Sequence, residues 1–165
     1  DAPGSQELRL TSVTLANGHG SPTALASVEE PLELRIEYRV ERPNLRFRCV
    51  AMFFAQGVCA FASMEPTEAV REAQGLYRSS VLIPGNLLAE GEYSVVISIF
   101  TSQGQKHRFV QGIDALAFQV FDPMTGSSAR GDYAQNFAGV MRPRLDWEMV
   151  FEERLNEATP VEAPR

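Results

Sequence analysis

An antiparallel β-sandwich of about eight strands is the fold that the sequence predicts. Apolar and polar residues alternate with a period of two in several stretches, which is typical of strands with one buried and one exposed face. Turn-forming pairs such as Asn17-Gly18 and Gln103-Gly104 separate these stretches at short intervals. Helical periodicity is scarce, so the helices of a parallel α/β fold are missing. The chain is therefore expected to be all-β.

The clearest strand covers residues 32–40, where five apolar residues alternate with glutamates and arginines. Residues 45–53 repeat the pattern around Arg46 and Arg48, and residues 93–99 repeat it around Ser94 and Ser98. In chain order, the expected strands are residues 8–15, 32–40, 45–53, 58–64, 76–83, 93–99, 115–121 and 140–151. Gln56-Gly57 predicts a hairpin turn before the fourth of these strands.

The remaining segments are assigned by their turn and tail signals. Residues 65–74 are expected to form a short helix or helical turn, because Pro66 suits a first turn and acidic residues come early. Residues 1–6 are expected to be a linker and residues 7–151 one sandwich domain. Residues 152–165, with two prolines and four glutamates, are expected to be a flexible tail.

Length and charge narrow the class of protein. The chain has 165 residues, 44% of them hydrophobic, which suits one globular domain with a core of its own. Its 21 acidic and 15 basic residues give a formal charge of −6, the wrong sign for a nucleic-acid partner. No apolar run approaches the length of a membrane span, so direct membrane insertion is not expected. The sequence does not begin with methionine, which favours a domain excised from a longer protein.

Cys49 and Cys59 are too few for a disulfide framework. In the predicted hairpin, Cys59 faces about Phe53, and Cys49 lies further along the strand. This register separates the two sulfurs. We therefore expect two reduced thiols, which suits a cytoplasmic protein.

Motifs for catalysis, nucleotides or metals are missing from the sequence. There is no phosphate-binding glycine loop and no GxSxG motif, and His19 and His107 stand alone in a turn and a loop. We therefore expect no enzyme activity, no cofactor and no metal. Arg130-Gly131-Asp132 spells an adhesion tripeptide, but three residues are weak evidence, and the segment is expected to be an ordinary turn.

The outward residues of two strands carry the candidate site. If the odd positions of residues 45–53 point inward, arginine, methionine, valine and phenylalanine share the opposite face, and the strand at residues 93–99 adds serines and Phe100. Such a mixture suits glycans, because arginine and hydroxyl groups bind sugar hydroxyls or carboxylates while flat apolar groups contact the sugar ring. A covering layer or a dimer contact explains the apolar members equally well. The predicted glycan-binding residues are Arg46, Arg48, Met52, Ser98 and Phe100.

Four stretches resemble a known family. They are the strand at residues 32–38, the proline turn and Gly91-Glu92-Tyr93 within residues 82–95, the Phe118-containing strand at 116–120, and residues 139–147 with Pro143 and Trp147. Together they resemble the C-terminal polysaccharide-recognition domain of Wzt-type ATPase subunits in bacterial O-antigen ABC transporters. The likeness covers roughly residues 7–151.

The resemblance implies an immunoglobulin-like sandwich in a cytoplasmic homodimer that exchanges its last strand. Residues 122–139 are polar and glycine-rich, which would let that strand reach a partner, with Val140, Leu145 and Trp147 at the dimer contact. The resemblance also implies that the domain binds the O-antigen polysaccharide at its capped non-reducing end for export, within lipopolysaccharide biosynthesis. The implied partners are an ABC ATPase domain in the same parent chain and a transporter subunit in the inner membrane.

Two competing functions remain open at this point. The same face could serve a β-sandwich protein-interaction or structural module that binds no glycan. A glycan-cleaving sandwich enzyme would instead need a pair of carboxylates inside a pocket.

Overall fold

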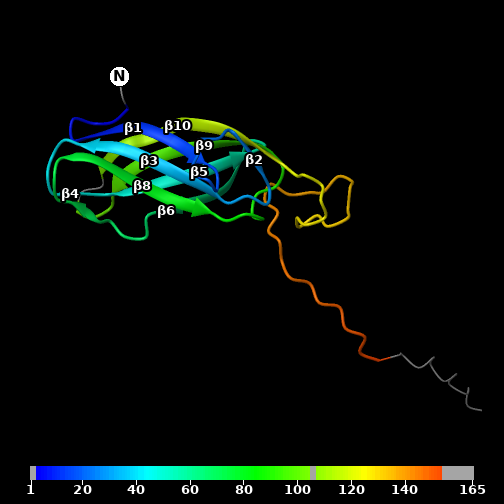
Figure 1. Cartoon of the computed structure of the whole chain (residues 1–165). Helices are drawn as coiled ribbons and strands as arrows, with labels where there is room; N and C mark the ends of the chain where they lie inside the picture. The colour runs from blue at the N-terminus through cyan, green and yellow to red at the C-terminus, as the bar shows by residue number, and fades with distance from the viewer. Residues whose placement is uncertain (1–2, 105–106, 154–165) are drawn as a thin grey trace, which may run out of the picture.

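The computed structural model describes residues 3–104 and 107–153 and is an all-β sandwich (Figure 1). This part of the chain contains ten strands and no helix, which confirms the predicted fold class. The strands are β1 (Leu8–Ala16), β2 (Leu25–Ser27), β3 (Leu32–Val40), β4 (Leu45–Arg46), β5 (Arg48–Ala55), β6 (Val58–Met64), β7 (Val70–Arg71), β8 (Gly75–Ile83), β9 (Gly91–Thr101) and β10 (His107–Phe121). Within the described residues, no helix is long and apolar enough to cross a membrane.

Two sheets face each other across the core (Figure 1). One sheet has the antiparallel order β1-β3-β8. The other has the order β2-β10-β9-β5-β6 and is antiparallel except for β2, which pairs parallel with β10. The short strands β4 and β7 pair with each other at one end of the sandwich.

The period-two pattern places one face of each strand in the core. Leu34, Ile36 and Tyr38 of β3 are buried opposite Ile97 and Ile99 of β9. Each fully buried side chain of this size stabilises the fold by about 1.5–3 kcal/mol relative to an exposed one. The core thus fixes which side of β5 and β9 faces solvent.

The hairpin turn and the free cysteines agree with the sequence analysis. Gln56 and Gly57 connect β5 to β6 with φ angles of 52° and 75°, as a two-residue turn with positive φ at both positions requires. Cys59 lies opposite Phe54, one position from the predicted partner, because the two-residue turn pairs Ala55 with Val58 and Phe54 with Cys59. Cys49 is buried and Cys59 exposed, and neither forms a disulfide.

Two strands have bounds that the sequence did not predict. The strand expected at residues 45–53 is divided at Phe47, so that β4 pairs with β7 while β5 joins the five-stranded sheet. β10 begins eight residues before the predicted start at residue 115. Its register with β9 shifts three times, and Gly112 has a φ of 55°, so the simple alternation is lost in its first half. The three-residue β2 was also missed.

The predicted helix at residues 65–74 is wrong. This segment is a loop followed by β7. The acidic residues that resembled a helix start instead bind other strands, since Glu65 accepts a hydrogen bond from Ser79 of β8 and Glu68 accepts one from Thr101 of β9. Tertiary contacts therefore override the local helix signal.

The strand predicted at residues 140–151 does not form within this chain. An isolated bridge joins Met141 to Leu88, and the Arg142 and Arg144 amides donate to the carbonyls of Leu87 and Asn86. From residue 145 onward the segment extends away from the sandwich (Figure 1). Val140 packs partly against the core, whereas Leu145 and Trp147 are 67% and 94% exposed. A strand needs a neighbouring strand for its backbone hydrogen bonds, and no strand of the described chain lies beside this segment.

The structure describes only part of the predicted linker and of the predicted tail. Residues 3–6, within the predicted linker, fold back onto β1: the Leu10 amide donates to the Pro3 carbonyl, and the Ser5 amide donates to Leu8. Most of the predicted tail, residues 154–165, lies outside the described residues.

Candidate functional site

The solvent side of the five-stranded sheet, here called the outer face, brings side chains from three strands into rows. Arg48, Val50, Met52 and Phe54 of β5 lie opposite Phe100, Ser98, Val96 and Ser94 of β9, in that order. On the other side of β9, Arg108, Asp114, Ala117 and Gln119 of β10 lie opposite Phe100, Val96, Ser94 and Glu92. Directly opposed side chains start about 5 Å apart, so each row forms one continuous surface.

One hollow of the outer face, called the Phe100 hollow, has a volume of about 310 Å³. Apolar groups of Val50, Met52 and Phe100 lie beside the polar groups of Ser98 and Arg108. The Ser98 hydroxyl accepts a hydrogen bond of 3.0 Å from the Gly112 amide, so its own proton remains available to a ligand. The full lining is Val50, Met52, Ser98, Phe100, Thr101, His107 and Arg108.

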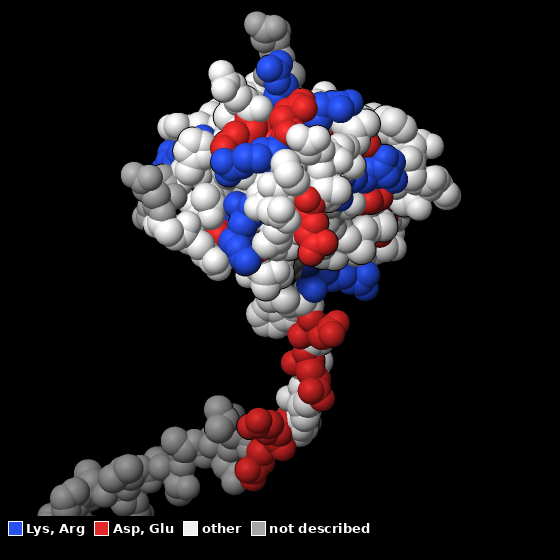
Figure 2. Space-filling view, turned by 90° about the vertical axis from the view of Figure 1, so that its left-hand side faces the viewer, with Lys and Arg blue, Asp and Glu red and all other residues white. Residues whose placement is uncertain are grey.

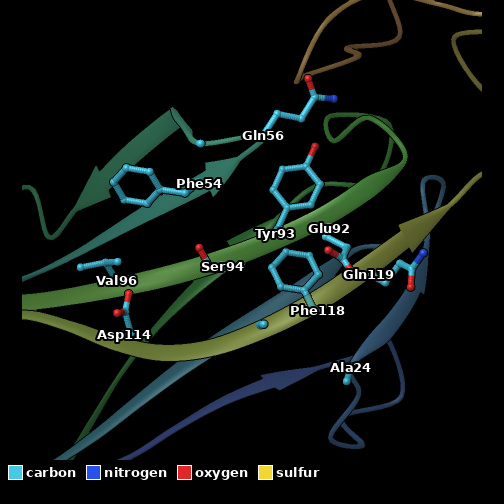
Figure 3. A pocket seen from close by; sticks show the side chains of 12 residues that line it. Ala24, Phe54, Gln56, Glu92, Tyr93, Ser94, Val96, Asp114, Phe118 and Gln119 are labelled. Atoms are coloured by element: carbon cyan, nitrogen blue, oxygen red, sulfur yellow. The ribbon is translucent and has the colours of Figure 1, made fainter.

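A second and larger hollow, called the Phe54 hollow, occupies about 820 Å³ toward the β5–β6 turn (Figure 3). The half-buried Phe54 ring lies opposite Ser94, and Asp114 and Gln119 of β10 line the same hollow, so that a hydroxyl, a carboxylate and an amide are offered beside the ring. The lining residues are Ala24, Phe54, Gln56, Gly57, Glu92, Tyr93, Ser94, Val96, Asp114, Ala117, Phe118 and Gln119. The two hollows are adjacent, because Met52 of one lies opposite Val96 of the other.

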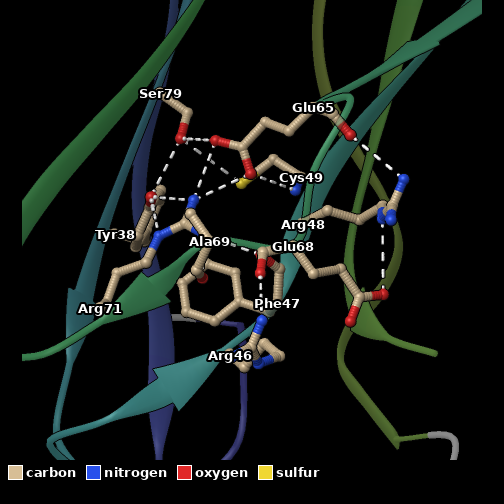
Figure 4. Close-up of polar contacts among 10 residues, drawn as sticks. All are labelled: Tyr38, Arg46, Phe47, Arg48, Cys49, Glu65, Glu68, Ala69, Arg71 and Ser79. Carbon is tan, nitrogen blue, oxygen red and sulfur yellow. Dashed lines mark hydrogen bonds and ion pairs between the residues drawn. The ribbon is translucent and has the colours of Figure 1, made fainter. Parts of the chain in front are cut away.

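The structure brings together three of the five predicted glycan-binding residues. Met52, Ser98 and Phe100 line the Phe100 hollow. Arg48 belongs to the same face, but its guanidinium turns toward the loop after β6, where it donates to the Glu65 carbonyl at 3.3 Å (Figure 4). Arg46 lies in β4, at the end of the sandwich, and donates to the Glu68 carbonyl at 3.1 Å.

Glu68 is a buried anchor behind this end of the outer face. Its carboxylate accepts hydrogen bonds from the Ser102 amide at 2.7 Å, the Ser102 hydroxyl at 2.6 Å and the Thr101 hydroxyl at 2.9 Å, and it lies 3.4 Å from Arg48. The bonds from Ser102 are the main reason why the pKa of Glu68 falls to about 2. The charged carboxylate therefore holds the end of β9, including Thr101 of the Phe100 hollow, at neutral pH, and this support is lost as the pH falls toward 2.

A second polar cluster lies between the sheets (Figure 4). Arg71 binds both carboxylate oxygens of Glu65 at 2.9 and 2.8 Å and donates to the Tyr38 hydroxyl at 2.9 Å. Burial alone would raise the pKa of Glu65, but hydrogen bonds from Ser79, Arg71 and the Cys49 amide outweigh it and lower the pKa. Burial, together with the nearby Glu65 charge, raises the pKa of Cys49 to about 12, so its thiol stays protonated and is a poor nucleophile at neutral pH.

The Arg-Gly-Asp tripeptide does not present its arginine to solvent. The Arg130 side chain is 7% exposed, forms an ion pair with Glu90 and lies 3.6 Å from Asp122. Arg142 also pairs with Glu90, and its guanidinium lies over the Phe137 ring. These contacts attach the 122–142 segment to the sandwich.

Sequence reasoning did not single out Gln56, Glu92, Asp114 or Gln119, which all line the Phe54 hollow. The position of Asp114 depends on a register shift of β10, for which the sequence gives little signal, whereas Gln119 follows the regular alternation of residues 116–120. Glu92 follows the same alternation as Ser94 and Ser98, so the outward face of β9 was a usable signal for it. Within residues 3–104 and 107–153, no group of three His, Cys, Asp or Glu side chains is arranged to hold a metal ion.

Comparisons with known proteins give a match in structure alone. No protein-family profile matches the sequence, and no curated protein matches it. A crystal structure of the C-terminal domain of Wzt superimposes with a TM-score of 0.66 over 90% of this chain and 86% of that one, at 9% sequence identity. At an identity this low, the structural match is evidence about the fold alone. The chain is therefore similar to the C-terminal domain of Wzt in fold, as its sequence motifs predicted.

Proposed function

We propose that this domain binds a polysaccharide across its outer face and does not act on it chemically. The observation that carries the proposal is the continuous row of outward side chains on β5 and β9, which joins the Phe100 hollow to the Phe54 hollow. Aromatic rings and methionine offer flat apolar contact, while serine, carboxylate, amide and arginine groups offer hydrogen bonds. This combination is what the two faces of a sugar ring require.

The dimensions of the outer face favour a chain of sugars over a single one. Phe100 and Ser94 are six residues apart on β9, so their side chains start about 20 Å apart along the strand. The two hollows follow one another along β5 and β9, as a linear ligand needs. The similarity in fold to the C-terminal domain of Wzt also favours a polysaccharide as the ligand.

The specific form of the proposal is an O-antigen domain. We infer that the ligand is the O-antigen polysaccharide, bound at its capped non-reducing end for export by an ABC transporter. In this account the domain belongs to the same parent chain as an ATPase domain and acts in the cytoplasm, next to a transporter subunit of the inner membrane.

Replacement of Phe100 by alanine is expected to weaken polysaccharide binding by about tenfold, because loss of an aromatic anchor from an interface commonly costs more than about 1 kcal/mol. The measurement is calorimetric titration of the chain with O-polysaccharide from its source organism. Leu82→Ala is the matched control, since Leu82 is an apolar residue of β8 with 69% exposure on the opposite sheet.

The titration also separates the competing functions. Binding of the wild-type chain that is weakened by Phe100→Ala and not by Leu82→Ala supports the proposal. Equal affinity of the wild type and the Phe100 variant would contradict binding at the outer face. A folded chain that binds no O-polysaccharide favours the protein-interaction alternative.

We also propose that two chains exchange their C-terminal segments. Leu145, Trp147, Met149 and Phe151 occur at every second position and are all largely exposed, while Asp146 and Glu148 lie between them. This is the pattern of a strand with one apolar face, yet in a single chain it extends into solvent with its acidic groups in a row (Figure 2). A second copy would supply the missing sheet edge and cover the apolar side chains.

Deletion of residues 145–165 is expected to convert a dimer into a folded monomer, because it removes the exchanged segment while leaving all ten strands intact. Light scattering after size-exclusion chromatography measures the mass, and circular dichroism checks the fold. Trp147→Asp should weaken the dimer in the same direction. A 165-residue chain that is monomeric, or a truncated chain that remains dimeric, would contradict the exchange.

A further inference from the structure

Acidic groups in the Phe54 hollow suggest which sugars it accepts. Glu92 and Asp114 are both exposed there, and neither forms a hydrogen bond or an ion pair within the described part of the chain. No lysine, arginine or histidine lines the hollow. The carboxylates on the other sheet differ, since Glu33 binds Arg35 at 2.8 Å and Glu37 binds Arg78 at 2.7 Å. The Phe54 hollow therefore carries two negative charges that the protein itself does not neutralise.

We infer that the Phe54 hollow accepts uncharged or amino sugars and disfavours acidic ones. This inference rests on the proposed function and names the class of sugar that binds at one end of the outer face. A carboxylate only accepts hydrogen bonds, and its natural ligands are hydroxyl and ammonium groups. A uronic acid or phosphorylated sugar would instead bring a third negative charge beside Glu92 and Asp114, which opposes binding.

The geometry places these acceptors around an apolar platform. Figure 3 shows Asp114 and Ser94 beside Val96, with Glu92 and Gln119 further along the hollow. Ser94 and Glu92 are two residues apart on β9, about 7 Å, and Glu92 lies opposite Gln119 on β10. A sugar that contacts the Phe54 ring would thus have hydrogen-bond acceptors on both sides.

The selectivity belongs to one end of the outer face. The Phe100 hollow carries Arg108 and His107 and has no acidic residue in its lining. A uniformly acidic polysaccharide would therefore be attracted at one hollow and repelled at the other. The informative comparison is therefore between the wild type and a variant of the Phe54 hollow, each binding an acidic ligand. The Phe100 hollow is the same in these two proteins and contributes equally to both affinities.

The test uses two forms of one polysaccharide with identical linkages. O-polysaccharide from the source organism is prepared in a neutral form, with any uronic acids reduced to alcohols, and in an acidic form, with its primary hydroxyls oxidised to carboxylates. Both forms are titrated at low ionic strength into the wild-type chain and into the double variant Glu92→Gln, Asp114→Asn. The control is Glu33→Gln, Glu37→Gln, which removes the same formal charge from the opposite sheet.

The ratio of the affinity for the acidic form to the affinity for the neutral form is expected to be at least about fivefold higher in the double variant of the Phe54 hollow than in the wild type. Added salt should reduce the difference, because exposed charges are screened. An unchanged ratio, or the same rise of the ratio in the control, would overturn the inference while leaving glycan binding in place. Failure of the wild type to bind either form would overturn the proposed function itself.

Discussion

Replacement of Phe47 by alanine is expected to lower the free energy of unfolding by about 4 kcal/mol. The Phe47 ring is fully buried between the two sheets, with its centroid 5.4 Å from Tyr38 and 5.9 Å from Phe109. The Arg71 guanidinium lies 4.0 Å from the centroid of the same ring. Alanine would leave a cavity and remove an aromatic and a cation–π contact at the point where β4 ends and β5 begins.

Chemical denaturation of the two proteins measures this loss directly. Phe121→Ala is the matched control, because Phe121 ends β10 with 43% of its surface exposed and should cost less than about 1 kcal/mol. A Phe47 variant within about 1 kcal/mol of the wild type would contradict the packing described here.

Replacement of Arg71 by alanine is expected to cost about 3 kcal/mol, although the residue lies in a loop-rich part of the sequence. Arg71 is 6% exposed and binds the Glu65 carboxylate, the Tyr38 hydroxyl and the Phe47 carbonyl. Its removal leaves the partly buried Glu65 without a counterion. The large cost reflects this unpaired charge and the lost hydrogen bonds.

An exposed ion pair provides the comparison. Arg78 binds Glu37 at 2.7 Å, but both side chains are more than one third exposed, so Arg78→Ala should cost less than about 1 kcal/mol. Urea unfolding of Arg71→Ala, Arg78→Ala and the wild type measures both effects. Similar losses for the two variants would show that burial does not make the Arg71–Glu65 pair more stabilising than an exposed pair.

A double variant tests the cause of the loss. Replacing Glu65 by leucine in the Arg71 variant should recover part of the lost stability, because no charge is then left unpaired.

The outward faces of β5 and β9 were predictable because their alternation is regular. Met52, Ser98 and Phe100 were assigned to one surface from period two alone, and the structure places them around one hollow. Arg46 and Arg48 share the alternation but not the hollow. Long side chains reach several ångströms from their strand, and these two are directed by Glu65 and Glu68, whose positions depend on the tertiary fold.

One part of the Phe54 hollow depends on a feature that a single sequence hides. Asp114 faces the hollow because the register of β10 shifts between Asp114 and Leu116. Gln119 lies where the register is regular, so the alternation of the predicted strand at residues 115–121 was a usable signal for it. The helix predicted at residues 65–74 failed because Glu65 and Glu68 accept hydrogen bonds from Ser79 of β8 and Thr101 of β9.

The C-terminal segment had the right pattern for a strand but has no partner within one chain. Leu145 and Trp147 alternate with acidic residues as a strand requires, and this periodicity predicts a segment suited to pairing. It does not say which chain supplies the pairing edge. That question belongs to the assembly, which the truncation experiment addresses.

The most direct test of the account is to map the polysaccharide on the ¹⁵N-labelled chain by NMR. Titration with an O-polysaccharide fragment should shift the amide signals of outer-face residues such as Met52, Ser94, Ser98, Phe100 and Asp114. The signals of β1, β3 and β8, on the opposite sheet, should stay in place. Shifts confined to the β1-β3-β8 sheet, or no shifts at saturating fragment, would contradict glycan recognition by the outer face.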